Sequence, residues 1–142
     1  MKILNLFLDY AAEFELAYAD DKWERLEKYF HPNATYTTDG IDHSKVEGRT
    51  EVLQTLKRNV TNFDRKCDSR LLTTKQKPKI ENQTLSRIWV CEFSLQGAAG
   101  LTIEGRETAK FKDNLIFELD EVLTPSSVEQ MTQWLKVNAH RL

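Results

Sequence analysis

The sequence predicts an α+β fold in which helices and strands occupy separate parts of the chain. Apolar residues recur at helical spacing near the start of the chain, alternate with polar residues at period two from Cys67 to Leu123, and return to helical spacing near the C-terminus. Helices that are segregated from a run of consecutive strands are typical of α+β proteins. We therefore expect the strands to pair antiparallel.

Length and charge limit the classes of function. The 142 residues have room for one domain, which we expect to span residues 1–142. Lys and Arg total 20 against 22 Asp and Glu, so the net charge of −2 gives no electrostatic reason to expect a nucleic-acid or membrane partner. The two cysteines, Cys67 and Cys91, are too few for a disulfide framework or a four-ligand zinc site, and we expect both to be reduced core residues.

The N-terminal segment is predicted to be a helix over residues 2–18. It superficially resembles a signal peptide, but Asn5 and Asp9 interrupt its apolar run and several acidic residues follow. We therefore expect a cytoplasmic location. The apolar stripe of this helix contains Ile3, Phe7, Tyr10, Phe14 and Ala17.

A short second helix is expected to end near Phe30. Asp21 and Glu24 have the spacing of a capping box at its start, and Pro32 disfavours helical geometry at His31.

A strand-like segment at 34–38, a polar loop from Asp39 to Gly48 and a third helix come next. The apolar side of this third helix contains Val52, Leu53, Leu56 and Val60. Strands are then predicted near residues 67–77, 84–96, 101–112 and 115–123. A last helix follows Pro125, with Ser126 and Glu129 at capping-box spacing.

Several segments together resemble a known family. A long helix is followed by a short helix that ends in YFHPNATY, a loop and VEGRTEVLQTL, and the later segments are SRIWVCEFSLQG, GRETAKFK and LIFELDEV. This order resembles the SnoaL-like, ketosteroid-isomerase-like branch of the NTF2-like superfamily. The resemblance implies a cone in which a curved antiparallel sheet wraps around the N-terminal helices and encloses an apolar pocket, here with an extra C-terminal helix. It also implies a homodimer through the outer face of the sheet, and no metal or cofactor.

The family's catalytic positions are only partly matched. A ketosteroid isomerase uses a carboxylate base and an oxyanion hole made by a tyrosine and a protonated aspartate. The tyrosine position falls on Phe14, which cannot donate a hydrogen bond. The base position falls on Thr38 when counted from Phe30, and on Asp39 when counted back from Gly48. Neighbouring residues on a strand face opposite sides, so only one of the two can point into the pocket. The alternative is that Asp39 is a solvated turn residue before Gly40.

Glu107 is a second candidate for acid–base chemistry. It shares a period-two face with Leu101, Ile103, Ala109 and Phe111, close to where the family places an acid. A carboxyl group in an apolar pocket is expected to have a raised pKa. The alternative is that Arg87 or Arg106 pairs with Glu107 structurally.

Other residues are weaker candidates. His43 lies in the predicted polar loop, where an imidazole near the pocket mouth could act as acid or base, although an exposed loop histidine explains it equally. Glu118, Asp120 or Glu121 could also supply a carboxylate, but strand residues of this kind are commonly solvated. The residues expected to line the pocket are Phe14, Tyr36, Trp89, Phe93, Phe111 and Phe117.

Two functions remain open on the sequence alone. The first is a protein that binds a small apolar ligand and performs general acid–base catalysis on a hydrophobic carbonyl compound, with Glu107 and Asp39 as candidate catalytic groups. The second is a non-catalytic module that binds a ligand or a protein. Two polar groups that converge inside one pocket would favour catalysis.

Overall fold

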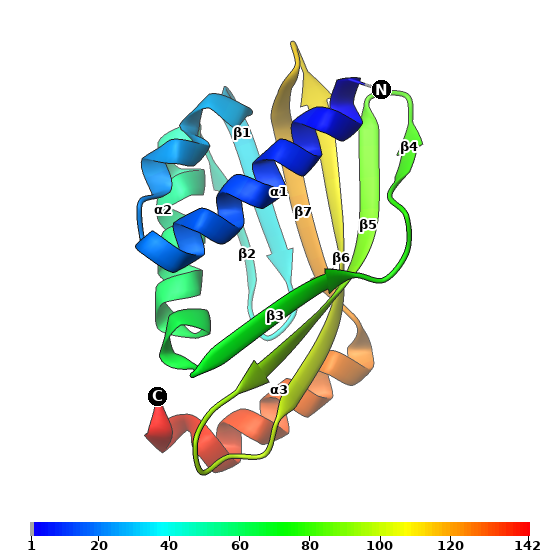
Figure 1. Cartoon of the computed structure of the whole chain (residues 1–142). Helices are drawn as coiled ribbons and strands as arrows, with labels where there is room; N and C mark the ends of the chain where they lie inside the picture. The colour runs from blue at the N-terminus through cyan, green and yellow to red at the C-terminus, as the bar shows by residue number, and fades with distance from the viewer. Residues whose placement is uncertain (1) are drawn as a thin grey trace.

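The computed structural model describes residues 2–142, and in it a strongly curved sheet packs against α-helices (Figure 1). The helices are α1 (Lys2–Asp20), α2 (Arg49–Asn62) and α3 (Pro125–Asn138), with shorter 3₁₀ turns η1 (Trp23–Tyr29), η2 (Asp64–Lys66) and η3 (Ala139–Arg141). The strands are β1 (Phe30–Asp39), β2 (His43–Glu47), β3 (Ser69–Thr74), β4 (Lys79–Glu81), β5 (Thr84–Ser94), β6 (Leu101–Lys112) and β7 (Leu115–Leu123). The predicted bounds of β6 and β7 are confirmed.

The sheet has the strand order β2-β1-β7-β6-β5-β3, and the short β4 also pairs with β5. Neighbouring strands run antiparallel except β1 and β7, which run parallel. The expectation of a purely antiparallel sheet was therefore wrong. The long connection through α2 and the later strands lets β7 return beside β1 in the same direction.

The polar segment before Gly48 is also not a loop as expected. Residues His43–Glu47 form β2, which pairs with β1 in a hairpin. Thr35 is aligned with Glu47 at one end of the hairpin, and Asp39 is aligned with His43 at the other. Its burial alternates, with half-buried Ser44 and Val46 between exposed neighbours, but only one of its residues is strongly apolar. A single apolar residue gives too weak a period-two pattern to identify a strand.

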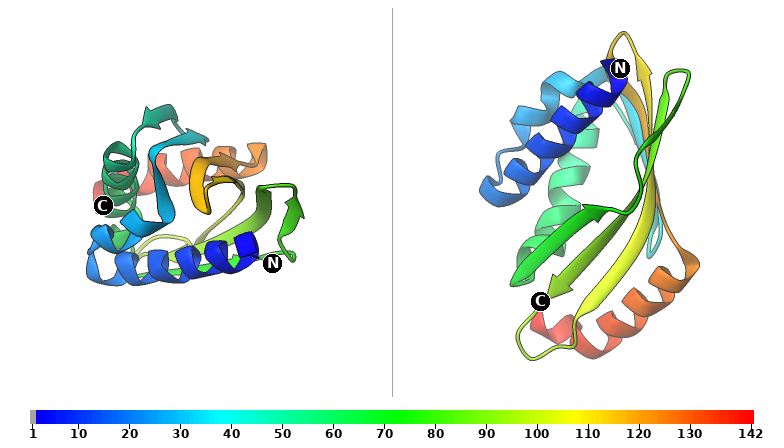
Figure 2. Two further views of the ribbon diagram at one scale, coloured as in Figure 1. Left: turned by 90° about the horizontal axis from the view of Figure 1, so that it is seen from above. Right: turned by 45° about the vertical axis from the view of Figure 1, so that its right-hand side comes forward.

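α1 lies across the concave face of the sheet and α2 stands beside it (Figures 1 and 2). The buried residues of α1 are Ile3, Phe7, Tyr10 and Ala17, which confirms the predicted apolar stripe. α1 continues to Asp20 because Asp21 takes a left-handed conformation that ends the helix.

Neither predicted capping box is formed. Asp21 instead accepts a hydrogen bond from the indole of Trp23 at 2.9 Å, and η1 has no side-chain cap. The N-cap of α3 is Thr124 rather than Ser126, and its hydroxyl accepts from the Ser127 backbone N–H. No described helix is long and apolar enough to cross a membrane.

The interior contains two separate apolar clusters. The first lies among α1, η1, α2 and one half of the sheet, and includes Phe7, Tyr10, Phe30, Leu85 and Leu119. The second lies at the other end of β5 and β6, where α3 packs, and includes Cys91, Phe93, Ile103 and Trp134. Both cysteines are buried and free, as predicted.

Gly105 makes room for the largest side chain of the second cluster. It pairs across the strands with Trp89, and a Cβ atom at Gly105 would lie only 2.4 Å from the indole ring. A glycine is therefore needed here for the ring to lie flat over β6. The indole fills the gap that the glycine leaves, an arrangement that also helps a sheet to bend.

Candidate functional site

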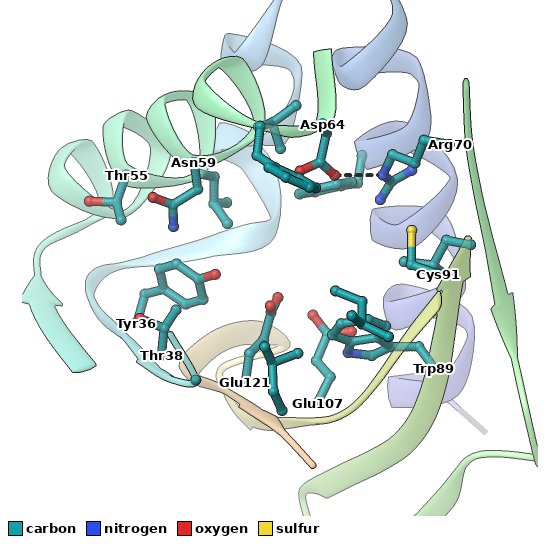
Figure 3. A pocket seen from close by; sticks show the side chains of 18 of the residues that line it. Tyr36, Thr38, Thr55, Asn59, Asp64, Arg70, Trp89, Cys91, Glu107 and Glu121 are labelled. Carbon is teal, nitrogen blue, oxygen red and sulfur yellow. Dashed lines mark hydrogen bonds and ion pairs between the residues drawn. The ribbon is translucent and has the colours of Figure 1, made fainter. Parts of the chain in front are cut away.

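A cavity of about 790 Å³ lies between the two clusters. The sheet forms one wall, while α1, α2 and the segment around η2 form the opposite wall (Figure 3). Side chains of α3, including Met131 and Leu135, reach its far end. The cavity belongs to neither apolar cluster alone, and its lining combines aromatic rings with charged groups.

A row of polar residues crosses the concave face of five neighbouring strands at the cavity. The backbone register aligns Arg87 with Glu107, Glu107 with Glu121, Glu121 with Thr38, and Thr38 with Ser44. We call these five residues the polar row. All five line the cavity, and the hydroxyls of Thr38 and Ser44 are hydrogen-bonded at 2.9 Å.

Apolar rows flank the polar row on both sides. On one side the aligned residues are Leu85, Ala109, Leu119, Tyr36 and Val46. On the other side they are Trp89, Gly105 and Leu123. The polar row is therefore held between apolar surfaces, where charged groups must find partners in the protein.

Glu107 forms the central ion pair of the polar row. The Nε of Arg87 donates to Oε1 of Glu107 at 2.8 Å, and the two side chains are only 12% and 4% exposed. The guanidinium also donates to Thr74 and lies 5.1 Å from the centre of the Phe7 ring. Glu107 thus faces the cavity as expected, but with the structural partner that the sequence left as the alternative.

A raised pKa is found at Glu121, which the sequence indicated only as one of three possible carboxylates on β7. Burial raises the pKa of Glu121 well above its ordinary value, and the charge of Glu107 and a hydrogen bond between the two carboxyls raise it further. Arg87 acts in the opposite direction but balances the charge of only one carboxylate. These effects all favour the protonated form of Glu121, and Figure 3 shows the two carboxyl groups side by side in the cavity.

Two phenols lie near the carboxyl pair. Burial raises the pKa of Tyr10 well above its usual range, followed by the charges of Glu107 and Glu121. The pKa of Tyr36 is raised in the same way by burial and then by Glu121, while Asn59 on α2 lowers it. Both phenols consequently stay protonated and able to donate. Tyr10 lies one helical turn before Phe14, so the donor that seemed absent from the first helix is present four residues earlier.

A second group of paired charges, formed by Arg70 of β3 with Asp64 and Glu15, lies across the cavity from the polar row. The Arg70 side chain is 3% exposed, and its guanidinium donates to Asp64 at 2.7 Å and to Glu15 at 2.5 Å. The rings of Phe14 and Tyr18 lie within 5.8 Å and 4.8 Å of that guanidinium. Burial raises the pKa of Asp64, with Arg70 opposing the shift. Sequence reasoning gave no sign of this pair, whose members lie in a turn and on a short strand.

Asp39 does not enter the cavity as a base would need to. Its side chain is 61% exposed at the rim, where the carboxylate lies 3.9 Å from Nδ1 of His43. Thr38 takes the inward position because it shares the face of Tyr36, two residues before it on β1. Of the two registers that the sequence left open, the structure therefore has the one with Thr38 inward, and Asp39 reaches only the rim of the cavity.

His43 also lies outside the cavity. Its side chain is 74% exposed at the start of β2, and Asp42 and Ser44 on either side are the residues that reach the rim.

Four of the six predicted pocket residues line the cavity: Phe14, Tyr36, Trp89 and Phe93. Phe111 is instead buried in the first cluster. Phe117 packs beside His31 and Lys112, away from the cavity. A bulge between Lys110 and Phe111 changes the register with β7, so that Ile116 rather than Phe117 faces inward.

Among residues 2–142, no group of three or more His, Cys, Asp or Glu side chains is arranged to hold a metal ion. The two cavity carboxyls of the polar row are partnered by Arg87 and by each other.

Comparison with solved structures identifies the architecture. An NTF2-like protein of unknown function from Burkholderia pseudomallei superposes with a TM-score of 0.72 at 9% identity, over 94% of this chain and 97% of that one. The fold is NTF2-like. A protein from Catenulispora acidiphila with a ketosteroid-isomerase-like fold, in complex with trimethylamine, gives 0.64 at 16% identity over 85% and 90%. A candidate polyketide cyclase from Xanthomonas campestris gives 0.63 at 12% identity over 91% and 96%. No protein-family profile and no curated protein matches the sequence.

The raised pKa of Glu121 predicts a specific pH dependence of stability. Between the pKa of the unfolded chain, about 4.3, and the higher folded pKa, the folded state binds one more proton. The stability that this proton contributes is complete below about pH 4.3 and is lost as the pH rises through the folded value. Glu121→Gln should therefore gain stability relative to the wild type by about 1.4 kcal/mol per pH unit in that interval.

Urea unfolding from about pH 4 to pH 8 measures this difference. Glu118→Gln is the matched control, because Glu118 lies on the same strand and pairs with Lys110 away from the cavity. A constant difference between wild type and Glu121→Gln across this range would contradict the assignment.

Proposed function

We propose that the protein binds a hydrophobic carbonyl compound in the cavity and moves a proton on it by general acid–base catalysis, as a SnoaL-like, ketosteroid-isomerase-like enzyme would. One observation carries the proposal: two carboxyl groups, Glu107 and Glu121, converge inside the cavity, and Arg87 balances the charge of only one of them. A carboxylate and a carboxylic acid side by side provide a base and an acid at the same pH.

The proposed step uses both groups. Glu107 takes a proton from the carbon next to the carbonyl, and the electrons of the broken C–H bond form a C=C bond. Glu121 gives its proton to the carbonyl oxygen, so the product is an enol and the number of protons is conserved. The hydrogen bond between the two carboxyls then offers a route for returning the proton from Glu107 to Glu121.

The phenols and the aromatic rings have supporting roles in this proposal. Tyr36, and Tyr10 behind it, are protonated donors near the carboxyl pair and would stabilise negative charge on the oxygen. Phe14, Trp89 and Phe93 provide flat apolar walls for the remainder of the ligand. The free, buried cysteines agree with a cytoplasmic location, which we include in the proposal.

Exchange of ketone α-protons into D₂O tests the step without knowledge of the natural substrate. We expect the wild type to accelerate exchange in small aromatic ketones such as 1-indanone and 1-tetralone, followed by proton NMR. Glu107→Gln and Glu121→Gln should each lower that acceleration by about 10²- to 10⁴-fold, because each removes one proton-transfer group.

Each active-site variant has a control variant on the same strand. Glu104→Gln on β6 and Glu118→Gln on β7 change glutamates that pair with Lys75 and Lys110 outside the cavity, and should leave exchange unchanged. Exchange at the buffer rate with wild-type protein that binds these ketones would contradict catalysis and favour the ligand-binding module.

We further propose a homodimer through the outer face of the sheet. Leu71 and Val122 are exposed on that side of β3 and β7, and burial of these side chains by a partner would remove apolar surface from water. A second copy would cover both. Sedimentation equilibrium at micromolar concentration should give twice the monomer mass, and Val122→Lys should restore the monomer. A wild-type monomer would contradict this prediction.

A further inference from the structure

The charged residues of the cavity are arranged so that its buried cations are already occupied. Two largely buried arginines line it, Arg87 on β5 and Arg70 on the edge strand β3, where it pairs with Asp64 and Glu15. Arg87 is paired with Glu107. A third arginine, Arg58, lies at the rim on the exposed side of α2, where it donates to Thr55.

Acidic side chains outnumber arginines around the cavity. The acidic lining residues are Glu15, Asp39, Asp42, Asp64, Glu107 and Glu121, against Arg58, Arg70 and Arg87. A ligand carboxylate or phosphate deep in the cavity would find Arg87 and Arg70 already paired and would lie among carboxyl groups, since Arg58, which has no carboxylate partner, lies at the exposed rim. An unpaired buried charge is costly, so an anion is rejected.

A cation is not favoured at the carboxyl pair either. Arg87 already pairs with Glu107, and burial together with the charge of Glu107 raises the pKa of the neighbouring Glu121 carboxyl, which favours its uncharged form. A ligand ammonium would form a full ion pair with Glu121 only after that carboxyl had lost its proton. The Glu121 carboxyl, which hydrogen-bonds to Glu107, and the Tyr36 hydroxyl, which hydrogen-bonds to Asn59, are donors on the cavity wall that suit an uncharged hydrogen-bond acceptor.

We infer that the cavity selects uncharged ligands that bear a hydrogen-bond acceptor, and that Glu107 and Asp64 determine this specificity by occupying the two buried arginines. The inference deepens the proposed function, on which it rests for the choice of cavity. A ligand of this cavity therefore has no carboxylate or phosphate group. Removal of the Glu107 carboxylate would leave Arg87 unpaired, and removal of the Asp64 carboxylate would leave Arg70 with Glu15 alone.

Three probes of similar size and different charge test the inference by isothermal titration calorimetry at neutral pH. They are 2-acetonaphthone, which is uncharged, 2-naphthoate, which is an anion, and 2-naphthylmethylammonium, which is a cation. The wild type is expected to bind the ketone at least about tenfold more tightly than either ion. Equal or tighter binding of the naphthoate or of the ammonium compound would overturn the inference.

Glu107→Gln should reverse the selectivity against anions. The variant leaves the Arg87 guanidinium unpaired at the cavity wall, so affinity for 2-naphthoate should rise about tenfold or more. The further change Arg87→Met in the same chain removes the uncovered cation and should abolish the gain. Glu104→Gln, on the outer side of β6, should leave the affinities as in the wild type.

Asp64→Asn provides an independent test at the opposite wall in case Glu107→Gln does not fold. It leaves Arg70 with only Glu15, whose side chain is 47% exposed, and should also raise the affinity for 2-naphthoate. Folded Glu107→Gln or Asp64→Asn protein that still rejects naphthoate would overturn the inference.

Glu121→Gln separates this inference from the proposed catalysis. It keeps both arginines occupied and supplies a neutral amide, so selectivity for the ketone should persist while proton exchange is lost. Loss of selectivity in this variant would contradict the specificity roles of Glu107 and Asp64. Absence of exchange in the wild type would contradict only the proposed catalysis.

Discussion

The cavity depends on one arrangement: a single cation, Arg87, lies beside two neighbouring carboxyls, the buried Glu107 and the less buried Glu121. Strand register places Arg87, Glu107 and Glu121 in one row across β5, β6 and β7, so their proximity follows from the backbone ladder. Removing one member of a buried ion pair leaves an uncompensated charge and is strongly destabilising. Because Arg87 pairs with only one carboxylate, the protonated form of the other carboxyl is favoured, and this asymmetry is the basis of the proposed acid–base function.

The curvature of the sheet explains why this row faces a cavity rather than a packed core. The apolar rows on either side belong to separate clusters, and α1 and α3 cover different ends of the sheet (Figure 2). The space between them is lined by the polar row and by the residues of α2 and η2 that face it. Gly105 lets the Trp89 ring lie against β6, which keeps that ring flat beside the carboxyl pair.

The sequence predicted the α+β class, the main helices and the later strands, because each of these has a strong apolar period. It also predicted the inward position of Glu107, since β6 alternates without interruption. Glu121 was named only as one of three possible carboxylates on β7, although Leu119 and Leu123 flank it at spacing two, because the bulge near Phe117 obscures the face of this strand. The inward residue of β1 stayed open between Thr38 and Asp39 because one residue of register reverses a strand face. Arg70 and Asp64 meet only through the tertiary fold, which no local pattern encodes.

Infrared spectroscopy with ¹³C-labelled glutamate tests most directly whether the Glu107–Glu121 carboxyl pair retains a proton. At neutral pH the wild type should show the carbonyl stretch of a buried protonated carboxylic acid. That band should be absent from Glu121→Gln and unchanged in Glu118→Gln. A spectrum in which every glutamate of the wild type is ionised at neutral pH, or a band that survives Glu121→Gln, would contradict the account.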